Sequence, residues 1–320
     1  MTSVFSNPVF SIITPTFRRP EMLKRNIRSV LSQTYGNYEH IIVDDGNDPE
    51  TDMIVRSFGD ERVRLLKHNL PKGAAASYNT GMKAAKGEFI SFLDDDDEYM
   101  QEYFEKIIAQ FSTSSEIGFI WTGIERVNDR EDGSEYIIRK VVWPAIFTDF
   151  ETGMASATSI GNGYGVCIRK KCLNEIGYYD EELLVGEDTD FLFRLAANYK
   201  FATIPEILVR IHSHERDQLT GKQNFSKRIE GKETILKRYK VVLKQYPKVF
   251  ITHNYGYATL CYESGLKSKG RDALLSVIGK DPFRLIWYLD LLSFETTSYA
   301  FGSTRLGLKI KSLINKVNYN

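Results

Sequence analysis

The sequence has few cysteines, no long apolar run and no net charge. It contains three cysteines in 320 residues, and Cys167 and Cys172 lack the second pair that a zinc site would need. We therefore predict buried free thiols in a reducing compartment. No stretch stays apolar for the roughly 18–20 residues that cross a bilayer, and the N-terminus lacks the pattern of a signal peptide. These absences predict a cytoplasmic protein.

Two ligand-binding motifs are also missing. The segment "TPTFRR" at 14–19 follows the first predicted strand without a glycine, which argues against a nicotinamide dehydrogenase, because that class needs Gly-x-Gly-x-x-Gly there. The segment "DDGNDPE" at 44–50 is no EF-hand, since Gly46 at the sixth position would put Ile41 where Asp is required. The 42% hydrophobic and 26% charged residues fit an ordinary globular protein.

The zero net charge conceals two regions of opposite sign. Residues 1–214 hold 23 Lys and Arg against 33 Asp and Glu, whereas residues 215–320 hold 19 against 9. We predict an α/β domain over 1–214, with halves at 1–98 and 99–214. A basic, mainly helical region is predicted over 215–320.

The first hundred residues alternate short β-rich runs with amphipathic helical patterns. This order predicts right-handed crossovers and a mainly parallel sheet flanked by helices. The predicted strands are 9–14, 39–45, 62–68 and 88–94, and the helices 21–34, 50–58, 74–86 and 99–111. Longer strands are expected at 117–128, 135–143 and 206–212.

Polar motifs follow the first four predicted strands, at 14–19, 44–50, 69–79 and 94–97. Ligands of open parallel sheets bind beyond the carboxyl ends of the strands, so the four loops predict one binding site. The last loop holds four consecutive aspartates, which repel one another unless water or a cation neutralises them.

Three quoted stretches in fixed order resemble the family-two inverting glycosyltransferases of the GT-A fold. They are "SIITPTFRRPEMLKRNIRSVLSQTYGNYEHIIVDDGNDPET", "NLPKGAAASYNTGMKAAKGEFISFLDDDDEY" and "GEDTDFLFRL". The resemblance covers about residues 9–214. It implies a Rossmann-like catalytic domain with a nucleotide-binding half followed by an acceptor-binding half.

A divalent cation, Mn²⁺ or Mg²⁺, is expected at the aspartates, because a diphosphate bridged by a hard cation needs carboxylate ligands. Spacing alone leaves two overlapping Asp-x-Asp triplets open. The resemblance places the metal ligand at Asp96, the ribose or a metal-bound water at Asp94, and a supporting role at Asp95. For Asp97, capping of the helix predicted at 99–111 is an equal alternative.

The remaining donor contacts are also implied by the resemblance. Asp45 matches the residue that reads the N3–H of uracil, and Pro15, Thr16 and Phe17 match the turn that holds the base. A core position is the alternative for Phe17. Phosphate contacts are expected from Arg19 and Lys72, either of which could instead face solvent, and from Asn79. Tyr78 stands where the family usually has arginine.

Inversion needs a carboxylate to take the proton of the acceptor hydroxyl. The family's base matches Asp188, with Glu187 near the acceptor; a helix cap is the alternative for Asp188, although Asp190 suits that duty better. The segment "RIH" makes His212 the match for a histidine that completes the metal shell in several relatives. A structural role is the alternative for His212, and His214 is the second candidate.

The last residues, "FGSTRLGLKIKSLINKVNYN", form a basic amphipathic pattern. Such a helix can lie on an anionic membrane, or it can dock on its own domain or a second subunit. The resemblance implies a UDP-sugar-dependent hexosyltransferase that acts on a saccharide acceptor, expected to be lipid-linked, in bacterial surface polysaccharide or O-antigen assembly. The rival is a non-catalytic scaffold that binds sugar nucleotide or cation.

Overall fold

The computed structural model describes residues 7–129, 135–142, 150–151, 153–155, 165–213 and 224–297. The chain divides into two compact units, one of residues 1–153 and 160–216, the other of residues 154–159 and 217–320. The predicted domain boundary after residue 214 falls outside the described residues and stays a prediction. The C-terminal segment 298–320, His214 and most of the loop 151–165 also lie outside them.

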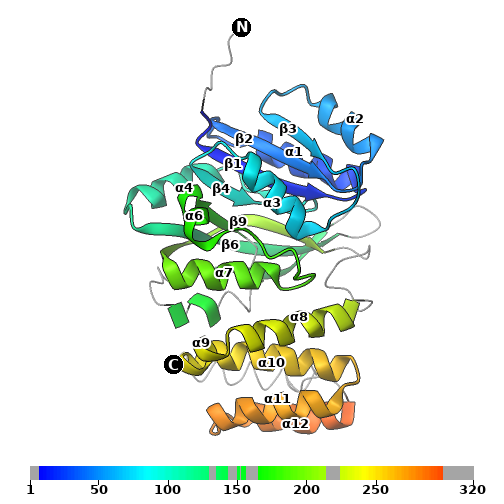
Figure 1. Ribbon diagram of the computed structural model, residues 1–320, viewed down its shortest axis with the longest axis vertical. Helices are drawn as coiled ribbons and strands as arrows, with labels where there is room; N and C mark the ends of the chain where they lie inside the picture. Colours follow the sequence, from blue (N-terminus) through cyan, green and yellow to red (C-terminus); the bar gives the residue numbers. More distant parts are fainter. Residues whose placement is uncertain are drawn as a thin grey trace. The chain divides into compact units, whose positions relative to one another are not determined.

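The first half of the large sheet is parallel, as predicted. Its strands have the spatial order β3-β2-β1-β4, and helices connect them (Figure 1). The strands are β1 (Phe10–Thr16), β2 (Tyr38–Asp44), β3 (Val63–Lys67) and β4 (Phe89–Phe92). The helices are α1 (Pro20–Leu31), α2 (Pro49–Ser57) and α3 (Ala74–Ala84). Buried β-branched residues and proline at the starts of α1 and α2 explain this order.

The second half of the sheet is mixed. The order continues β4-β8-β6-β9-β5, with β7 paired to β6; only the β6–β9 pair is parallel here. The strands are β5 (Glu98–Tyr99), β6 (Ile117–Asp129), β7 (Glu135–Val141), β8 (Val166–Arg169) and β9 (Lys200–Ser213). The expectation of a mainly parallel sheet thus describes the first half better.

Two predicted boundaries in this half are wrong. The last strand begins at Lys200 and not at 206, because the residues from Phe201 to Ile204 are buried beside β6. The helix expected from 99 is α4 (Tyr103–Ser112), because Glu98 and Tyr99 pair with β9 first.

Close packing fixes the helices that border the site. A Cβ at Gly81 of α3 would lie 2.3 Å from Ile13 of β1, so only glycine lets the helix sit this deep. On the other side, η1 (Lys170–Cys172) and α6 (Leu173–Ile176) precede α7 (Glu187–Asn198), which lies near β6 in Figure 1. The ring of Phe191 in α7 packs edge-on against Phe92 of β4, with 6.0 Å between centroids.

The second unit is helical in its described part, as predicted. Its helices are α8 (Phe225–Arg238), α9 (Lys240–Gln245), α10 (Pro247–Glu263), α11 (Lys267–Lys280) and α12 (Leu285–Thr297). They share one apolar core in which the rings of Tyr262 and Phe294 stack at 4.4 Å. The three cysteines are free and buried, which confirms the prediction of buried thiols.

Candidate active site

The four aspartates form a tight turn directly after β4. The Asp97 N–H donates to the Asp94 carbonyl at 3.1 Å, which closes the turn. The buried Asn26 amide of α1 donates to the carbonyls of Asp94, at 2.8 Å, and of Asp97, at 3.3 Å. This turn gathers carboxylate oxygens of Asp94, Asp96 and Asp97 within 4.8 Å of one another. Oxygen ligands at this spacing suit a hard divalent cation.

The acidic turn is electrostatically strained. Burial, followed by the charge of Asp96, raises the pKa of Asp94 to about 6. Burial also raises the pKa of Asp95 to about 7, although Arg19 opposes the shift. The pKa of Asp97 is raised well above its usual value by burial and then by Asp96 and Asp94. A cation placed among these groups would relieve the repulsion.

The loop after β1 supports the acidic turn. Thr16 donates its hydroxyl to Asp95 at 2.7 Å, and Arg19 Nη1 lies 3.2 Å from oxygens of both Asp95 and Asp96. Thr16 and Arg19, which were predicted to contact the nucleotide, therefore both bind the Asp95 carboxylate. The predicted contacts of Thr16 and Arg19 with a nucleotide stay predictions.

Phe17 lies at the surface with 46% of its area exposed, next to the Arg18 guanidinium 5.2 Å away. This exposure rules out the alternative that Phe17 is a core residue. Pro15 precedes it in β1, opposite Val43 of β2. An exposed ring at the carboxyl edge of the sheet is free to stack on a planar base.

Asp45 is buried and holds the loop after β3. Its carboxylate accepts hydrogen bonds from the N–H groups of Lys72 and Gly73, both at 2.8 Å, and lies 2.7 Å from Nδ1 of His68. The Lys72 side chain is exposed, so its backbone and not its charge meets Asp45. Asp48 caps α2 through the Glu50 N–H, as a turn residue should.

Tyr78 and Asn79 of α3 face different neighbours. The Tyr78 hydroxyl donates to Asp94 at 2.5 Å, a contact that the sequence analysis missed. The Asn79 amide donates to the Tyr179 carbonyl at 3.0 Å and to Glu181 at 2.7 Å, and it accepts from the Tyr179 N–H. Asn79 thus fastens the loop that leads to α7, while its predicted contact with the nucleotide remains untested.

The start of α7 carries the candidate base. The N-cap position is Gly186, with a φ of 95°, and no side chain caps the helix from there. Asp188 lies inside the first turn, where its carboxylate accepts the Thr189 N–H at 2.6 Å. Asp190 is buried and pairs with Arg194 at 2.8 Å. Burial and then the neighbouring Asp188 raise the pKa of Glu187 to about 8. The charge of Asp188 also raises the pKa of Asp94, which places the two carboxyls within electrostatic reach.

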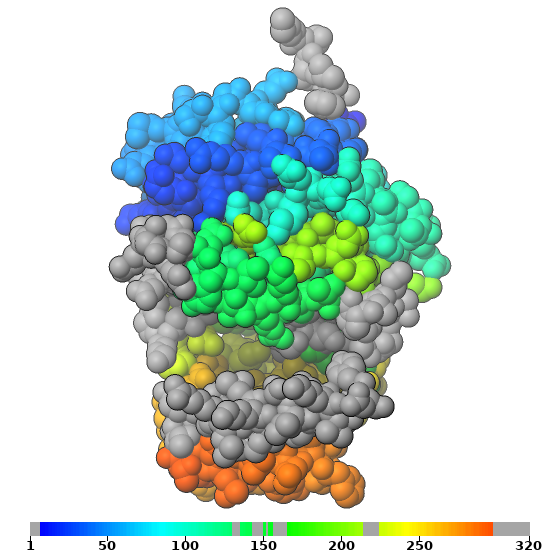
Figure 2. Space-filling model, turned by 180° about the vertical axis from the view of Figure 1, so that it is seen from behind, coloured from blue at the N-terminus to red at the C-terminus, as the bar shows by residue number. Residues whose placement is uncertain are grey.

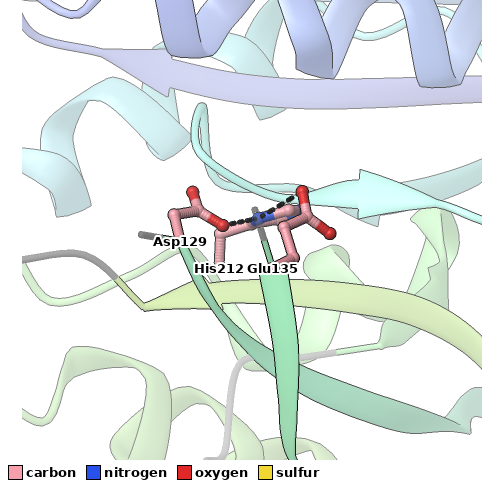
Figure 3. A group of neighbouring side chains, drawn as sticks. All are labelled: Asp129, Glu135 and His212. Atoms are coloured by element: carbon pink, nitrogen blue, oxygen red, sulfur yellow. Dashed lines mark hydrogen bonds and ion pairs between the residues drawn. The ribbon is translucent and has the colours of Figure 1, made fainter. Parts of the chain in front are cut away.

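His212 belongs to a second polar cluster, formed by the ends of β6, β7 and β9 (Figure 3). Its ring nitrogens lie 2.7 Å from Asp129 and 2.8 Å from Glu98, with Glu135 at 3.9 Å. Burial would lower the pKa of His212, but the hydrogen bonds to Glu98 and Asp129 outweigh it and raise this pKa. The structure groups His212 with Asp129 and Glu135, apart from the Asp94 group, so its predicted role beside Asp96 stays a prediction.

Two links connect this histidine cluster with the acidic turn. The His212 N–H donates to Asp97 at 3.0 Å. Arg25 of α1 donates to the Asp96 carbonyl at 2.8 Å and pairs with Asp129 at 3.1 Å. Asp97 therefore supports β9 and does not cap α4, which begins after Glu102. Arg25 and Asn26 were not among the predicted site residues, although a polar Asn26 beside Ile27 on the buried face of α1 was a usable signal.

A parallel half-sheet that continues into a mixed half, with an acidic turn where the two halves meet, is the GT-A fold of glycosyltransferases. Residues 11–168 match the sequence model of the family described as Glycosyl transferase family 2. The chain belongs to this family.

One curated relative and two solved structures illustrate the range of similarity. The Escherichia coli enzyme WfgD, a "UDP-Glc:alpha-D-GlcNAc-diphosphoundecaprenol beta-1,3-glucosyltransferase", is 36% identical over 138 residues, which are 43% of this chain. The chain spans about half (52%) of the length of WfgD. Staphylococcus aureus TarS, solved with UDP-GlcNAc, aligns with a TM-score of 0.65 and 17% identity over 90% of this chain and 88% of its own. The mannosyltransferase PcManGT from Pyrobaculum calidifontis, solved with GDP-Man and Mn²⁺, aligns with a TM-score of 0.58 and 12% identity. The alignment covers 96% of this chain and 84% of PcManGT.

In the described part of the chain, no helix combines the length and apolarity needed to cross a membrane.

Proposed function

We propose that this chain is a metal-dependent inverting hexosyltransferase that moves a sugar from a nucleoside diphosphate to a saccharide hydroxyl. The observation that carries the proposal is the pairing of two acidic groups at one edge of the sheet. The turn after β4 gathers three carboxylates, and the start of α7 brings Asp188 close enough to shift the pKa of Asp94. In an inverting displacement the leaving diphosphate and the attacking hydroxyl lie on opposite faces of the sugar, so the acidic turn would serve one face and Asp188 the other.

The chain's own residues suit a direct displacement. Asp188 would accept the proton of the acceptor hydroxyl as its oxygen bonds to the anomeric carbon, while the bond from that carbon to the phosphate oxygen breaks. Glu187, with its pKa raised to about 8, would hold a proton at neutral pH and donate a hydrogen bond to the acceptor. The exposed ring of Phe17 would stack on the base, and Asp45 would position the loop around it.

The acidic turn fits a divalent cation by its donor set. Asp94, Asp96 and Asp97 offer hard oxygen ligands, and the raised pKa values of Asp94 and Asp97 record the repulsion that such an ion would remove. In this assignment Asp96 holds the ion, with Asp94 beside it. When bound, Mn²⁺ or Mg²⁺ stabilises the negative charge that develops on the leaving diphosphate.

The donor and acceptor follow from relatives by analogy. WfgD names UDP-glucose and a diphosphoundecaprenol-linked sugar, and TarS was solved with UDP-GlcNAc. These names support a UDP-sugar donor and a lipid-linked acceptor in bacterial surface polysaccharide or O-antigen assembly.

The test is sugar release from UDP-, GDP- and dTDP-sugars, with Mn²⁺ present and after chelation. We expect metal-dependent release from a UDP-sugar, and a loss of at least about 10³-fold in Asp188→Asn with nucleotide affinity retained. Asp190→Asn is the matched control for helix stability, because Asp190 pairs with Arg194 in the same turn. Nucleotide binding without any turnover in the native protein would favour the non-catalytic scaffold instead.

A further inference from the structure

The last described helix, α12, is apolar on two opposite sides. Its inner side packs Trp287 and Phe294 into the core of the helical unit. Its outer side exposes 69% of Leu285, 41% of Tyr288 and 67% of Leu292, three residues spaced for one helical face. Phe283, just before the helix, is 97% exposed. We call these four residues the α12 stripe. Exposed apolar side chains that form a continuous stripe indicate a contact surface.

The acidic groups near the stripe are buried or have partners within the helical unit. Asp290 is 1% exposed and accepts the Tyr255 hydroxyl at 2.8 Å. Glu295 pairs with Arg271 at 2.7 Å, and Asp281 accepts from the Trp287 ring nitrogen at 3.3 Å. Arg284 lies between Phe283 and Leu285 of the stripe; its side chain is 62% exposed and lies 3.9 Å from Asp281.

The surrounding unit is basic as well. Residues 224–297 contain 13 Lys and Arg against 7 Asp and Glu. The last described helices, α11 and α12, form the orange surface in Figure 2. Aromatic and leucine side chains next to arginine, on a basic body, match the interfacial region of an anionic bilayer in both polarity and charge.

We propose that the α12 stripe is a docking surface for an anionic lipid membrane. The stripe would insert shallowly, with Phe283 at the acyl boundary and Arg284 at the lipid phosphates. The relevance of such docking to a lipid-linked acceptor rests on the proposed function, but the docking itself does not.

The test is flotation of the full-length protein with vesicles of phosphatidylcholine, alone or mixed with phosphatidylglycerol. We expect binding to the mixed vesicles and a decrease of about tenfold or more in Leu285→Gln/Leu292→Gln, because two leucines leave the bilayer. Met53→Gln/Val241→Gln is the matched control, since these side chains are 63% and 72% exposed elsewhere on the surface. Arg284→Glu should lose binding without any loss of apolar area.

Equal flotation of native protein and stripe variant would overturn the proposal, as would no flotation of the native protein. A native dimer that becomes monomeric in the stripe variant, without a change in flotation, would assign the stripe to a second copy and overturn it too. Sugar release from a soluble UDP-sugar should be equal in the native protein and stripe variant. Absence of that release would contradict the proposed function and leave the flotation result intact.

Discussion

The acidic turn and the histidine cluster lie in the same unit and are both rich in carboxylates, yet their charges are balanced differently. In the histidine cluster, hydrogen bonds from His212 outweigh burial and lower the pKa values of Glu98 and Asp129. In the acidic turn, burial and mutual repulsion raise those of Asp94 and Asp97. The acids of the histidine cluster are paired with His212 and Arg25, whereas a cation at the acidic turn, as proposed above, would relieve repulsion that remains there. Raised carboxyl pKa values therefore distinguish a candidate metal site from a structural ion network better than the number of acids does.

The largest difference should appear in turnover. We expect Asp96→Asn to lower Mn²⁺-supported sugar transfer by about 10³-fold or more, because a ligand to the ion is removed. Asp129→Asn should lower transfer by about tenfold at most for the folded protein, because Asp129 contacts Arg25 and His212 and is not one of the carboxylates of the acidic turn. Initial rates at saturating Mn²⁺ measure both. Equal losses would show that the two groups act as one site.

Stability should respond in the opposite order. Asp129→Asn leaves the buried ring of His212 and the Arg25 guanidinium with one fewer carboxylate, which should lower the free energy of unfolding by about 2–3 kcal/mol. Asp97→Asn should cost less or even stabilise the metal-free protein, because it removes repulsion. Urea titrations in the presence of chelator compare the two. A larger loss in the Asp97 variant would contradict the assigned balance.

Metal binding should stabilise through the acidic turn alone. At about 100 times its dissociation constant, Mn²⁺ should raise the free energy of unfolding by about 2.7 kcal/mol in the native protein and in Asp129→Asn. The increase should disappear in Asp94→Asn/Asp96→Asn. Thermal unfolding with and without Mn²⁺ reports this directly. A response retained by the double variant and absent in Asp129→Asn would move the metal to the histidine cluster.

The last prediction concerns pH. Glu187 has an ordinary pKa of 4.5 when unfolded and about 8 when folded. The unfolded state therefore loses its proton first as pH rises, so the native protein loses stability between about pH 4.5 and 8. Glu187→Gln should be more stable than the native protein by up to about 4 kcal/mol at pH 8, the full size of this shift, with no difference near pH 4. Glu182→Gln, at an exposed position, is the control. No pH-dependent difference would refute the shifted pKa.

The fold was predictable because most of its signals are local. The buried strands, the prolines that start α1 and α2, and the order of elements were all visible in the sequence. The boundaries that failed depended on distant partners. The local pattern placed Glu98 and Tyr99 next to the start of a helix, but they pair with β9 in the structure. The strand β9 begins earlier than predicted because its first residues pair with β6.

The loops that form the candidate site were predictable, but the hydrogen bonds between their side chains were not. Nothing in the sequence reveals that the Tyr78 hydroxyl meets Asp94 from 16 residues away, or that His212 lies between Glu98 and Asp129. Such contacts depend on strand register and on the depth of α3 against β1. Residue type left helix capping and a ligand role equally open for Asp97, whereas geometry ties it to Asp94, Asp96 and the His212 backbone.

The hydrogen bonds from Asn26 have a consequence for the choice of ion. Because they hold the backbone at both ends of the turn, they would keep the carboxylates close together before a cation binds. Little chain ordering is then left for binding to accomplish, and ionic radius should govern preference among Mg²⁺, Mn²⁺ and Ca²⁺. Asn26→Ala should reduce the differences in affinity among these three ions, because the carboxylate oxygens could then move apart.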